Sequence, residues 1–341
     1  MTTPTLATRF TNRFNLTTPI ALAPMALAAG GALAAACARA GALGLVGGGY
    51  GDTDWVTREY GLAADLLADD AQAQTRLGCG FITWKLDENA AALDVVLQHS
   101  VPPAAIMLSF GDARPYAARI KAAGAALVCQ VQRIEHLAAA VAAGADVIVV
   151  QGGEAGGHGI NATLARSVFT LVPEAADFLA AHAPQTLLLA AGGIADGRGL
   201  AAALMLGADG VLVGSRLWAT VESLAPMAAK QHVVPISGDG TARSAVFDVL
   251  RRKSWPAPYD FRAVRNDLHR QWEDRIDALR ANPDAARAEY DKGLAAQDFN
   301  RAHVTVGEAV GLITDLPTAA DWLTRATDQA QRLIAPSTKT P

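Results

Sequence analysis

A repeated unit constrains the fold of this 341-residue chain more than any other feature. Four times an alanine-rich stretch ends at a glycine that is followed by alanine and an apolar run, at Gly41-Ala42, Gly124-Ala125, Gly144-Ala145 and Gly207-Ala208. A glycine after the last helical turn adopts the left-handed conformation that lets the chain reverse. Each unit is therefore interpreted as a helix followed by a strand. Residues 124–144 hold one complete strand and helix between two such glycines.

Eight apolar runs are candidate strands. They span residues 20–24, 43–46, 80–83, 105–110, 126–130, 147–151, 186–191 and 211–214. Runs that are apolar throughout, rather than alternating, are typical of parallel strands buried on both faces. Eight such strands separated by helices predict an α/β fold of the (β/α)8 TIM barrel type, with a doubly wound open sheet as the alternative.

The character of the chain changes after about residue 228. Aromatic residues stand there among many Arg and Asp residues, with prolines between them, at Trp255, Tyr259, Trp272, Tyr290 and Phe299. This texture predicts a C-terminal helical appendage. We expect residues 1–228 to form the barrel and residues 229–316 to form a helical lid or substrate domain. Residues 317–334 have an amphipathic pattern and are the candidate for the last barrel helix.

Charge and cysteine content exclude several classes of protein. The chain has 29 Lys and Arg against 33 Asp and Glu, so a net charge of −4 leaves no basic footprint for nucleic acid or an anionic membrane. Its three cysteines, Cys37, Cys79 and Cys129, cannot form a complete disulfide framework, which favours the cytoplasm. They lack C-x2-C spacing and no two of the seven histidines are four residues apart, so no metal site is expected.

The uncharged residues 15–38 resemble a membrane or targeting segment, but Pro24 and two glycines interrupt them, which favours soluble structure.

A glycine-rich loop follows the sixth expected strand, in the sequence Gln151-Gly152-Gly153-Glu154-Ala155-Gly156-Gly157-His158-Gly159. Its five glycines before and after His158 allow close approach of the backbone to a ligand and leave amide groups unobstructed. A flexible loop that carries a surface histidine is the alternative. In a TIM barrel the active site lies at the C-terminal ends of the strands, which is where this loop begins.

Two further glycine turns follow the seventh and eighth expected strands. The first contains Gly192 and Gly193, and the second contains Gly214 and Ser215. Turns at these two strand ends, each opening a helix, form the usual phosphate site of this fold. They therefore predict a phosphate-bearing cofactor, although glycines in tight turns are the simpler alternative. No Walker loop or G-x-S-x-G elbow is present, and the match Gly157-His158-Gly159-Ile160-Asn161-Ala162 lacks the context of a dinucleotide-binding unit.

These segments together resemble the nitronate monooxygenase family, whose members are FMN-dependent TIM barrels. The resemblance covers roughly residues 15–225 and the segment 307–313. It is carried by Ala23-Pro24-Met25, the run from Gln151 to His158, the run from Ala190 to Gly199, and Leu206 to Arg216. Enoyl-ACP reductase II and NAD(P)H:quinone reductases are similar barrels, so the motifs are more specific for the superfamily than for one reaction.

The resemblance implies a role for thirteen residues. It makes His158 the catalytic residue and places Gly192, Gly193, Gly214 and Ser215 at the FMN phosphate. The remaining flavin contacts that it implies are Ala23, Pro24, Met25, Thr83, Gln130, Gln151, Gly156 and Gly157. The chain departs from the family pattern where several relatives have Lys in place of Gln130 and Thr in place of Ser215. The third strand ends in Gly80-Phe81-Ile82-Thr83, where relatives often have Asn.

The resemblance implies oxidation of alkyl nitronates with dioxygen to a carbonyl compound and nitrite, with nitroalkanes as further candidate substrates. A neutral nitroalkane must first lose an α-proton, and an imidazole is suited to that because it titrates near neutral pH. Glu154 is expected to hold nearby amides rather than to act as a second acid or base. The alternatives are an NAD(P)H-dependent reductase of quinones or enoyl thioesters and a flavin-binding protein for sensing or storage. No motif indicates the physiological substrate or the oligomeric state.

Overall fold

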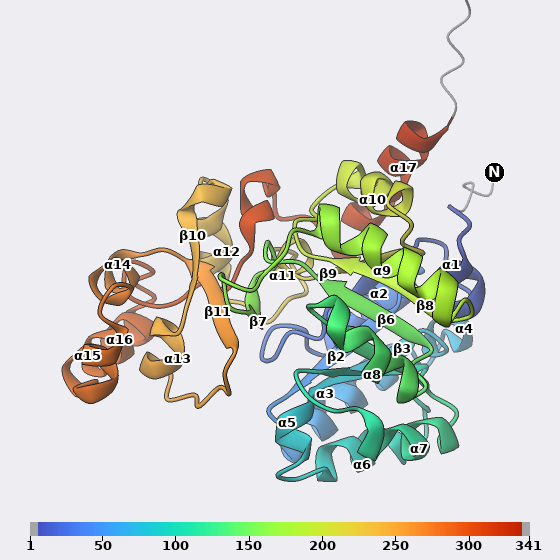
Figure 1. Ribbon diagram of the computed structural model, residues 1–341, viewed down its shortest axis with the longest axis horizontal. Helices are drawn as coiled ribbons and strands as arrows, with labels where there is room; N and C mark the ends of the chain where they lie inside the picture. Colours follow the sequence, from blue (N-terminus) through green and yellow to red (C-terminus); the bar gives the residue numbers. More distant parts are fainter. Residues whose placement is uncertain (1–5, 336–341) are drawn as a thin grey trace, which may run out of the picture.

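The computed structural model describes residues 6–335 and contains a closed barrel of eight parallel strands (Figure 1). Neighbouring strands follow the order β1-β9-β8-β6-β5-β4-β3-β2, and a parallel bridge between Ala21 and Leu43 joins β1 to β2. The strands are β1 (Ile20–Leu22), β2 (Gly44–Gly49), β3 (Leu77–Ile82), β4 (Ala105–Ser109), β5 (Ala126–Val131), β6 (Val147–Gln151), β8 (Leu187–Ala191) and β9 (Gly210–Val213). The predicted TIM barrel is therefore confirmed, and the closure excludes an open sheet.

Helices cover the outside of the barrel between successive strands (Figure 1). They are α2 (Gly31–Arg39), α3 (Thr53–Leu66), α4 (Ala71–Gln74), α5 (Thr83–Leu86), α6 (Ala91–Leu97), α7 (Arg114–Ala122), η1 (Ile134–His136), α8 (Leu137–Ala142), α9 (Val168–His182) and α10 (Gly197–Met205). Helix α17 (Ala319–Ile334) lies where residues 317–334 were expected to form a helix, and it packs on α10 and α2. The indole nitrogen of Trp322 on α17 donates to the carbonyl of Ala195 at 3.0 Å. The polypeptide thus returns to the barrel after a long excursion.

The four glycines of the repeated unit all have positive φ, at 88° for Gly41, 79° for Gly124, 77° for Gly144 and 101° for Gly207. In each case the amide of the following alanine donates to a carbonyl five residues earlier, as in Ala42 to Cys37 at 3.0 Å and Ala145 to Ala140 at 3.1 Å. This bond is the signature of the Schellman motif. The local sequence therefore ends these helices and directs the chain into the next strand.

Apolar side chains pack on both faces of the barrel strands, against the helices on the outside and against one another on the inside. Ile20, Leu22, Val46 and their equivalents face the helices, whereas Ala21, Leu45 and Met107 belong to the cluster inside the barrel. The side chains of Phe10 and Phe14 on α1 (Arg9–Phe14) belong to the inner cluster as well. Helix α1 therefore covers the end of the barrel at which the strands begin, and the opposite end is left for the functional site.

Residues between β9 and α17 form the appended segment. It contains α11 (Ser215–Trp218), α12 (Met227–Val233), η2 (Gly238–Gly240), β10 (Thr241–Ser244), α13 (Val246–Leu250), β11 (Tyr259–Val264), α14 (Asp267–Trp272), α15 (Ile276–Ala281), α16 (Asp284–Ala296) and η3 (Glu308–Leu312). Helices dominate, as expected, but β10 and β11 also form an antiparallel sheet with β7 (Gly157–Ile160), which comes from the glycine-rich loop. The sequence Gly-His-Gly-Ile has no alternating apolar pattern, so the pairing partner, and not local propensity, makes β7 a strand.

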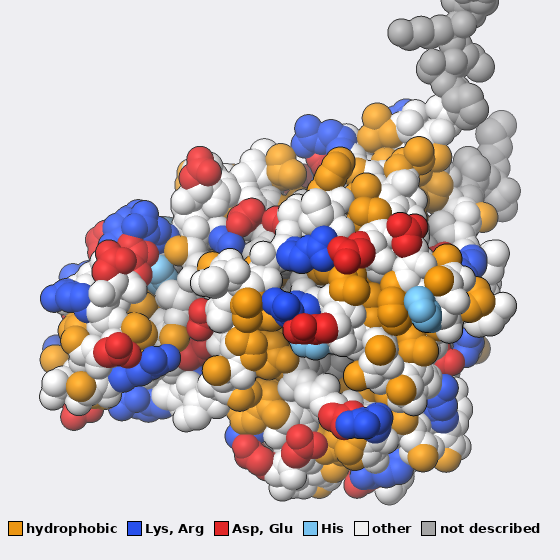
Figure 2. All heavy atoms as spheres, in the orientation of Figure 1, with side chains coloured by type: hydrophobic (Ala, Val, Ile, Leu, Met, Phe, Trp, Pro, Cys, Tyr) orange, Lys and Arg blue, Asp and Glu red, His pale blue; other side chains and the backbone are white. Residues whose placement is uncertain are grey.

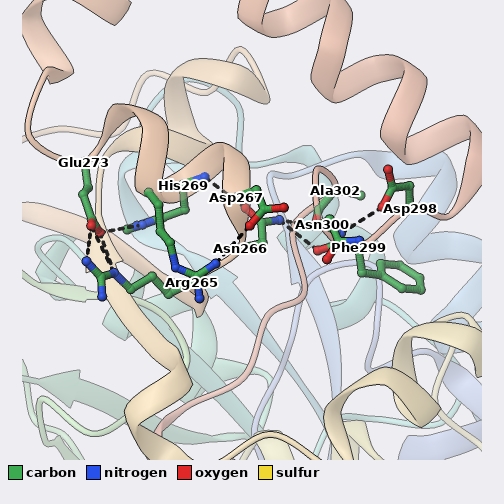
Figure 3. Close-up of polar contacts among 10 residues, drawn as sticks. Arg265, Asn266, Asp267, His269, Glu273, Asp298, Phe299, Asn300 and Ala302 are labelled. Carbon is green, nitrogen blue, oxygen red and sulfur yellow. Dashed lines mark hydrogen bonds and ion pairs between the residues drawn. The ribbon is translucent and has the colours of Figure 1, made fainter.

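Hydrogen bonds from Asn266 hold the appended helices together (Figure 3). Its side-chain oxygen caps α14 by accepting from the amide of His269 at 3.0 Å. Its side-chain nitrogen donates to the carbonyls of Phe299 and Ala302 at 3.0 and 2.9 Å. Nearby, Glu273 lies between Arg265 and His269. The connection after α16 is thereby fixed to the start of α14.

The outer face of the appended segment is highly charged. Figure 2 shows basic and acidic side chains interspersed there, and several form ion pairs such as Arg270–Asp267 and Arg301–Glu289. Exposed pairs of this kind each contribute little, about 0–1 kcal/mol. Among the helices of residues 6–335, none is long and apolar enough to cross a membrane.

Candidate active site

A cavity of about 480 Å³ lies at the C-terminal ends of the barrel strands, between them and the appended segment. The end or extension of each strand contributes to its wall, from Pro24 after β1 to Gly214 after β9. The appended segment contributes Arg251, Trp255 and His303. This is the end of the barrel at which TIM-barrel enzymes have their active sites.

The structure brings almost all of the predicted site residues together in this wall. The residues that line the cavity are Ala23, Pro24, Met25, Gln130, Gln151, Gly156, Gly157, His158, Gly192, Gly193, Gly214 and Ser215. Thr83 lies behind the wall at the start of α5, where its side chain is fully buried against Gly111. Its neighbour Ile82 occupies the lining position at the end of β3.

The two glycine turns after β8 and β9 line the cavity with backbone. Gly192 and Gly193 have φ of 107° and 72°, a left-handed backbone that favours glycine. A β-carbon at Gly193 or Gly214 would make an ordinary contact, at 3.5 Å with Glu154 and at 3.6 Å with Ala23. One at Gly192 would lie 3.1 Å from the amide nitrogen of Ala155, which is a close approach. The hydroxyl of Ser215 accepts from the amide of Gly307 at 2.8 Å, which joins this end of the cavity to the appended segment.

The carboxylate of Glu154 forms its hydrogen bonds with two residues that do not line the cavity. It accepts from the hydroxyl of Ser167 at 2.7 Å and from the amide of Val168 at 3.0 Å. Val168 is the first residue of α9, so the carboxylate interacts favourably with the start of that helix. These contacts agree with the interpretation of Glu154 as a residue that holds amides.

Glutamine side chains connect β5 and β6 to the strand that carries His158. The side-chain oxygen of Gln151 accepts from Gln130 at 3.3 Å and from Gln132 at 3.2 Å. Its nitrogen donates to the main-chain carbonyl of His158 at 3.0 Å. Gln151 therefore ties β7 to the ends of β5 and β6. The side-chain oxygen of Gln130 has no hydrogen-bond partner among residues 6–335.

The imidazole of His158 is held on three sides by the appended segment. Its Nε2 lies 2.8 Å from Oδ1 of Asp248, and the two side chains are only 9% and 6% exposed. The ring stacks on Trp255 with centroids 3.5 Å apart and planes 12° apart, and Phe261 lies at 4.7 Å. His158 is paired with Phe261 across β7 and β11. The imidazole thus has one orientation with respect to the cavity.

Burial and the carboxylate act in opposite directions on His158. Burial is the larger effect and lowers the pKa of His158, while the hydrogen bond and charge of Asp248 raise it. Because a carboxylate only accepts, the neutral imidazole carries its proton on Nε2 and donates it to Asp248. The lone pair of the neutral ring is then on Nδ1.

Comparison with known proteins identifies the family. The family model for nitronate monooxygenase matches residues 7–328. The chain is 31% identical to a nitronate monooxygenase of Neurospora crassa and 34% identical to the nitronate monooxygenase npaC of Metarhizium robertsii, over 92% of this chain in each case and 89% and 90% of theirs. The chain belongs to the nitronate monooxygenase family. It is therefore an oxidoreductase.

A solved structure has the same fold over nearly the whole chain. The structure of FabK from Thermotoga maritima superposes with a TM-score of 0.79 at 26% identity, and covers 97% of this chain and 98% of that one. The superposition extends through the appended segment as well as the barrel, since so little of either chain lies outside it.

This nitronate monooxygenase family member has a second histidine at the cavity, His303, which is not equivalent to His158. Its Nδ1 lies 2.7 Å from the hydroxyl of Tyr290. Burial, with a smaller effect of the Arg251 charge, lowers the pKa of His303 to about 3. An imidazole with so low a pKa is a poor base at neutral pH, so His158 is the better candidate for proton transfer.

Sequence reasoning missed the partners of His158. Asp248, Arg251 and Phe261 lie about 90 to 100 residues beyond the loop and belong to no recognisable motif. Trp255 was noted only as part of the aromatic texture of the appendage. The sequence gives one indication of these contacts, because aromatic residues cluster in an otherwise charged segment. Such a cluster predicts a buried surface in the appended segment but does not identify the residues that contact His158.

Proposed function

We propose that this protein is an FMN-dependent enzyme that oxidises alkyl nitronates with dioxygen to a carbonyl compound and nitrite, and that it also accepts nitroalkanes. The observation that carries this proposal is His158, which is paired with Asp248 and lines a cavity that also contains the two glycine turns after β8 and β9. The family assignment supports the reaction class.

FMN, rather than a larger dinucleotide, is the cofactor that we expect, because the two glycine turns would form a single phosphate site. The backbone amides of the turns at Gly193 and Gly214 and the hydroxyl of Ser215 line the cavity and would supply donors for a phosphate. Backbone at Pro24 and Met25 and the free oxygen of Gln130 would hold the ring. The bound flavin would supply the acceptor for electrons from the substrate.

His158 would act as the base for neutral substrates. Nδ1 would take the α-proton of a nitroalkane, and the imidazolium so formed would be stabilised by Asp248 at Nε2. Burial keeps the ring neutral before the reaction because it lowers the pKa of His158. A preformed nitronate has already lost this proton, so for that substrate the pair only orients the anion.

Residues 229–316 would serve as a lid and substrate domain. This segment supplies the pair partner Asp248 and the apolar residues Leu294 and Phe299 at the cavity. An apolar wall excludes water from reactive intermediates and suits an alkyl chain. We also place the protein in the cytoplasm, because Cys37, Cys79 and Cys129 are buried and unpaired.

One experiment on the purified protein tests the cofactor and the reaction together. Mass spectrometry of the chromophore released by heat should identify FMN, and FAD or no flavin would refute the cofactor assignment. Under anaerobic conditions an alkyl nitronate alone should bleach the yellow protein. Bleaching by NADH or NADPH alone would instead identify a reductase, and bleaching by neither would favour a flavin-binding protein without this activity.

A further inference from the structure

Arg251 introduces a positive charge into the apolar part of the cavity. It follows α13 directly and lines the same cavity as His158. Its guanidinium lies over the ring of Phe261, with Cζ 4.7 Å from the centroid, and Phe261 in turn contacts His158. The charge is close enough to His158 and His303 to lower the pKa of both. Arg251 thus lies beside the reactive imidazole.

Two polar side chains of the described structure lie near this cation, the hydroxyl of Tyr50, which is hydrogen-bonded to Arg251, and the carboxylate of Asp248. The nearest carboxylate is that of Asp248, whose Oδ1 is 4.0 Å from Nη1 and already bonded to His158. Nη1 of Arg251 is buried and has no hydrogen-bond partner in residues 6–335. The other charged residue in the cavity wall is Glu154, whose carboxylate is occupied at the start of α9. A buried guanidinium nitrogen without a hydrogen-bond acceptor is costly, so an acceptor is expected to bind at Nη1.

We propose that Arg251 forms an anion subsite that binds the two oxygens of a nitronate and makes the cavity select planar anions over neutral molecules of the same shape. A nitronate carries its charge on two coplanar oxygens, as a carboxylate does, and a guanidinium matches that arrangement with two parallel N–H donors. The subsite rests on the proposed function for its natural ligand, but its preference for anions is a separate property.

The subsite also explains how both kinds of substrate use one cavity. A preformed nitronate binds Arg251 with its full charge. A nitroalkane acquires that charge only as His158 removes the proton, so Arg251 then stabilises the anion as it forms. In both cases the alkyl part faces the apolar residues of the appended segment, such as Leu294 and Phe299.

The first test uses the unmodified, flavin-loaded protein and calorimetry with two isosteric probes that do not react. One is 2-methylpropanoate, which has the shape and charge of a small nitronate, and the other is the neutral 2-methylpropanamide. We expect the carboxylate to bind at least about tenfold more tightly, because a hydrogen bond to a charged group is worth about 1.5–3 kcal/mol. Equal binding of the two probes would overturn the proposal without any question of misfolding.

The second test assigns the preference to Arg251. Arg251→Met should remove the discrimination between the probes and raise the KM for a nitronate more than it lowers kcat, whereas Arg251→Lys should keep part of the preference. Arg252→Met is the matched control, because Arg252 is an exposed residue that pairs with Asp291 and is not part of the cavity wall. It should bind both probes as the unmodified protein does.

The outcomes separate this inference from the proposed reaction. If Arg251→Met retains its flavin and still prefers the carboxylate, the subsite lies elsewhere and the inference is wrong. If nitronates are not oxidised but carboxylate binding depends on Arg251, the subsite is supported and the proposed reaction fails. If the unmodified protein oxidises nitronates, and Arg251→Met retains its flavin but loses the discrimination and has a raised KM for the nitronate, both the subsite and the proposed reaction are supported.

Discussion

Nε2 of His158 and Oδ1 of Asp248 lie 2.8 Å apart, although the residues are separated by 90 positions in the chain. His158 is on β7, which leaves the barrel, and Asp248 is on α13 of the appended segment. The sheet β10-β11-β7 joins these two parts of the chain. The candidate base is therefore complete only when the appended segment is folded onto the barrel.

Replacing Asp248 by Asn should weaken His158 as a base. Asp248 raises the pKa of His158 against the larger lowering by burial, so the loss of its charge lowers that pKa further. The Asn amide can donate as well as accept, so the proton of the neutral ring is no longer fixed on Nε2. We expect kcat/KM for a nitroalkane to fall by about 10²–10⁴-fold, the usual contribution of a positioned base. Because the base must be neutral, the acidic limb of the pH profile should also move to lower pH.

Asp291→Asn is the matched control for this change. Asp291 is exposed and pairs with Arg252 outside the cavity, so its loss should leave the pH profile in place. A pH profile of Asp248→Asn that coincides with that of the unmodified protein would show that the carboxylate does not act on His158.

Replacing His158 by Asn tests the role of the imidazole. The side chain keeps a polar group but cannot accept a proton near neutral pH, and the expected flavin contacts are largely backbone, so the cofactor should remain bound. Oxidation of a neutral nitroalkane should fall by about 10²–10⁴-fold. Oxidation of the corresponding preformed nitronate should fall much less. Equal losses on the two substrates, measured as kcat/KM, would rule out proton abstraction by His158.

Removing the stacking partner should shift the pH profile in the opposite direction. Trp255 covers one face of His158 at 3.5 Å, and its indole nitrogen donates to the hydroxyl of Tyr50 at 3.0 Å. Trp255→Ala admits water to the ring, so the pKa of His158 should rise toward its ordinary value and the acidic limb should move to higher pH. Trp255→Phe keeps an aromatic face and should show a smaller shift. If the two variants moved the limb equally, burial by the indole would not be its cause.

Local sequence was sufficient to predict the barrel because each of its units is specified by residues close together. Gly41 and Gly207 end helices through backbone hydrogen bonds between residues at most five positions apart. Strand β6 is buried at every position, and its run of apolar residues is visible in the sequence without knowledge of the neighbouring strands. The same reasoning placed Gly193 and Gly214 at the ends of their strands. These features need no knowledge of distant parts of the chain.

The rest of the site depends on pairing between distant segments. His158 was predicted on a loop, but it lies on β7 because β11 supplies the hydrogen-bonding partner about 100 residues later. Asp248 became a partner of His158 through the same sheet, and no spacing rule connects them. Thr83 was placed at the cofactor by resemblance, while the structure buries its side chain next to the wall. Its contact with a cofactor stays a prediction.

Replacing Gly193 by Glu tests the position of the phosphate. A β-carbon there would lie 3.5 Å from that of Glu154, an ordinary contact, so the side chain has room and steric exclusion is not the expected effect. The positive φ of 72° adds strain for any other residue, and Gly193→Asn is the matched control because Asn tolerates this conformation best. The Glu carboxylate would lie where we expect the phosphate, and like charges that are withdrawn from water repel strongly.

We expect the Glu variant to be purified with little flavin and the Asn variant to keep most of it, as measured by flavin absorbance per protein. Thermal unfolding of both variants should show that both are folded. A folded Glu variant with full flavin content would place the phosphate elsewhere in the cavity.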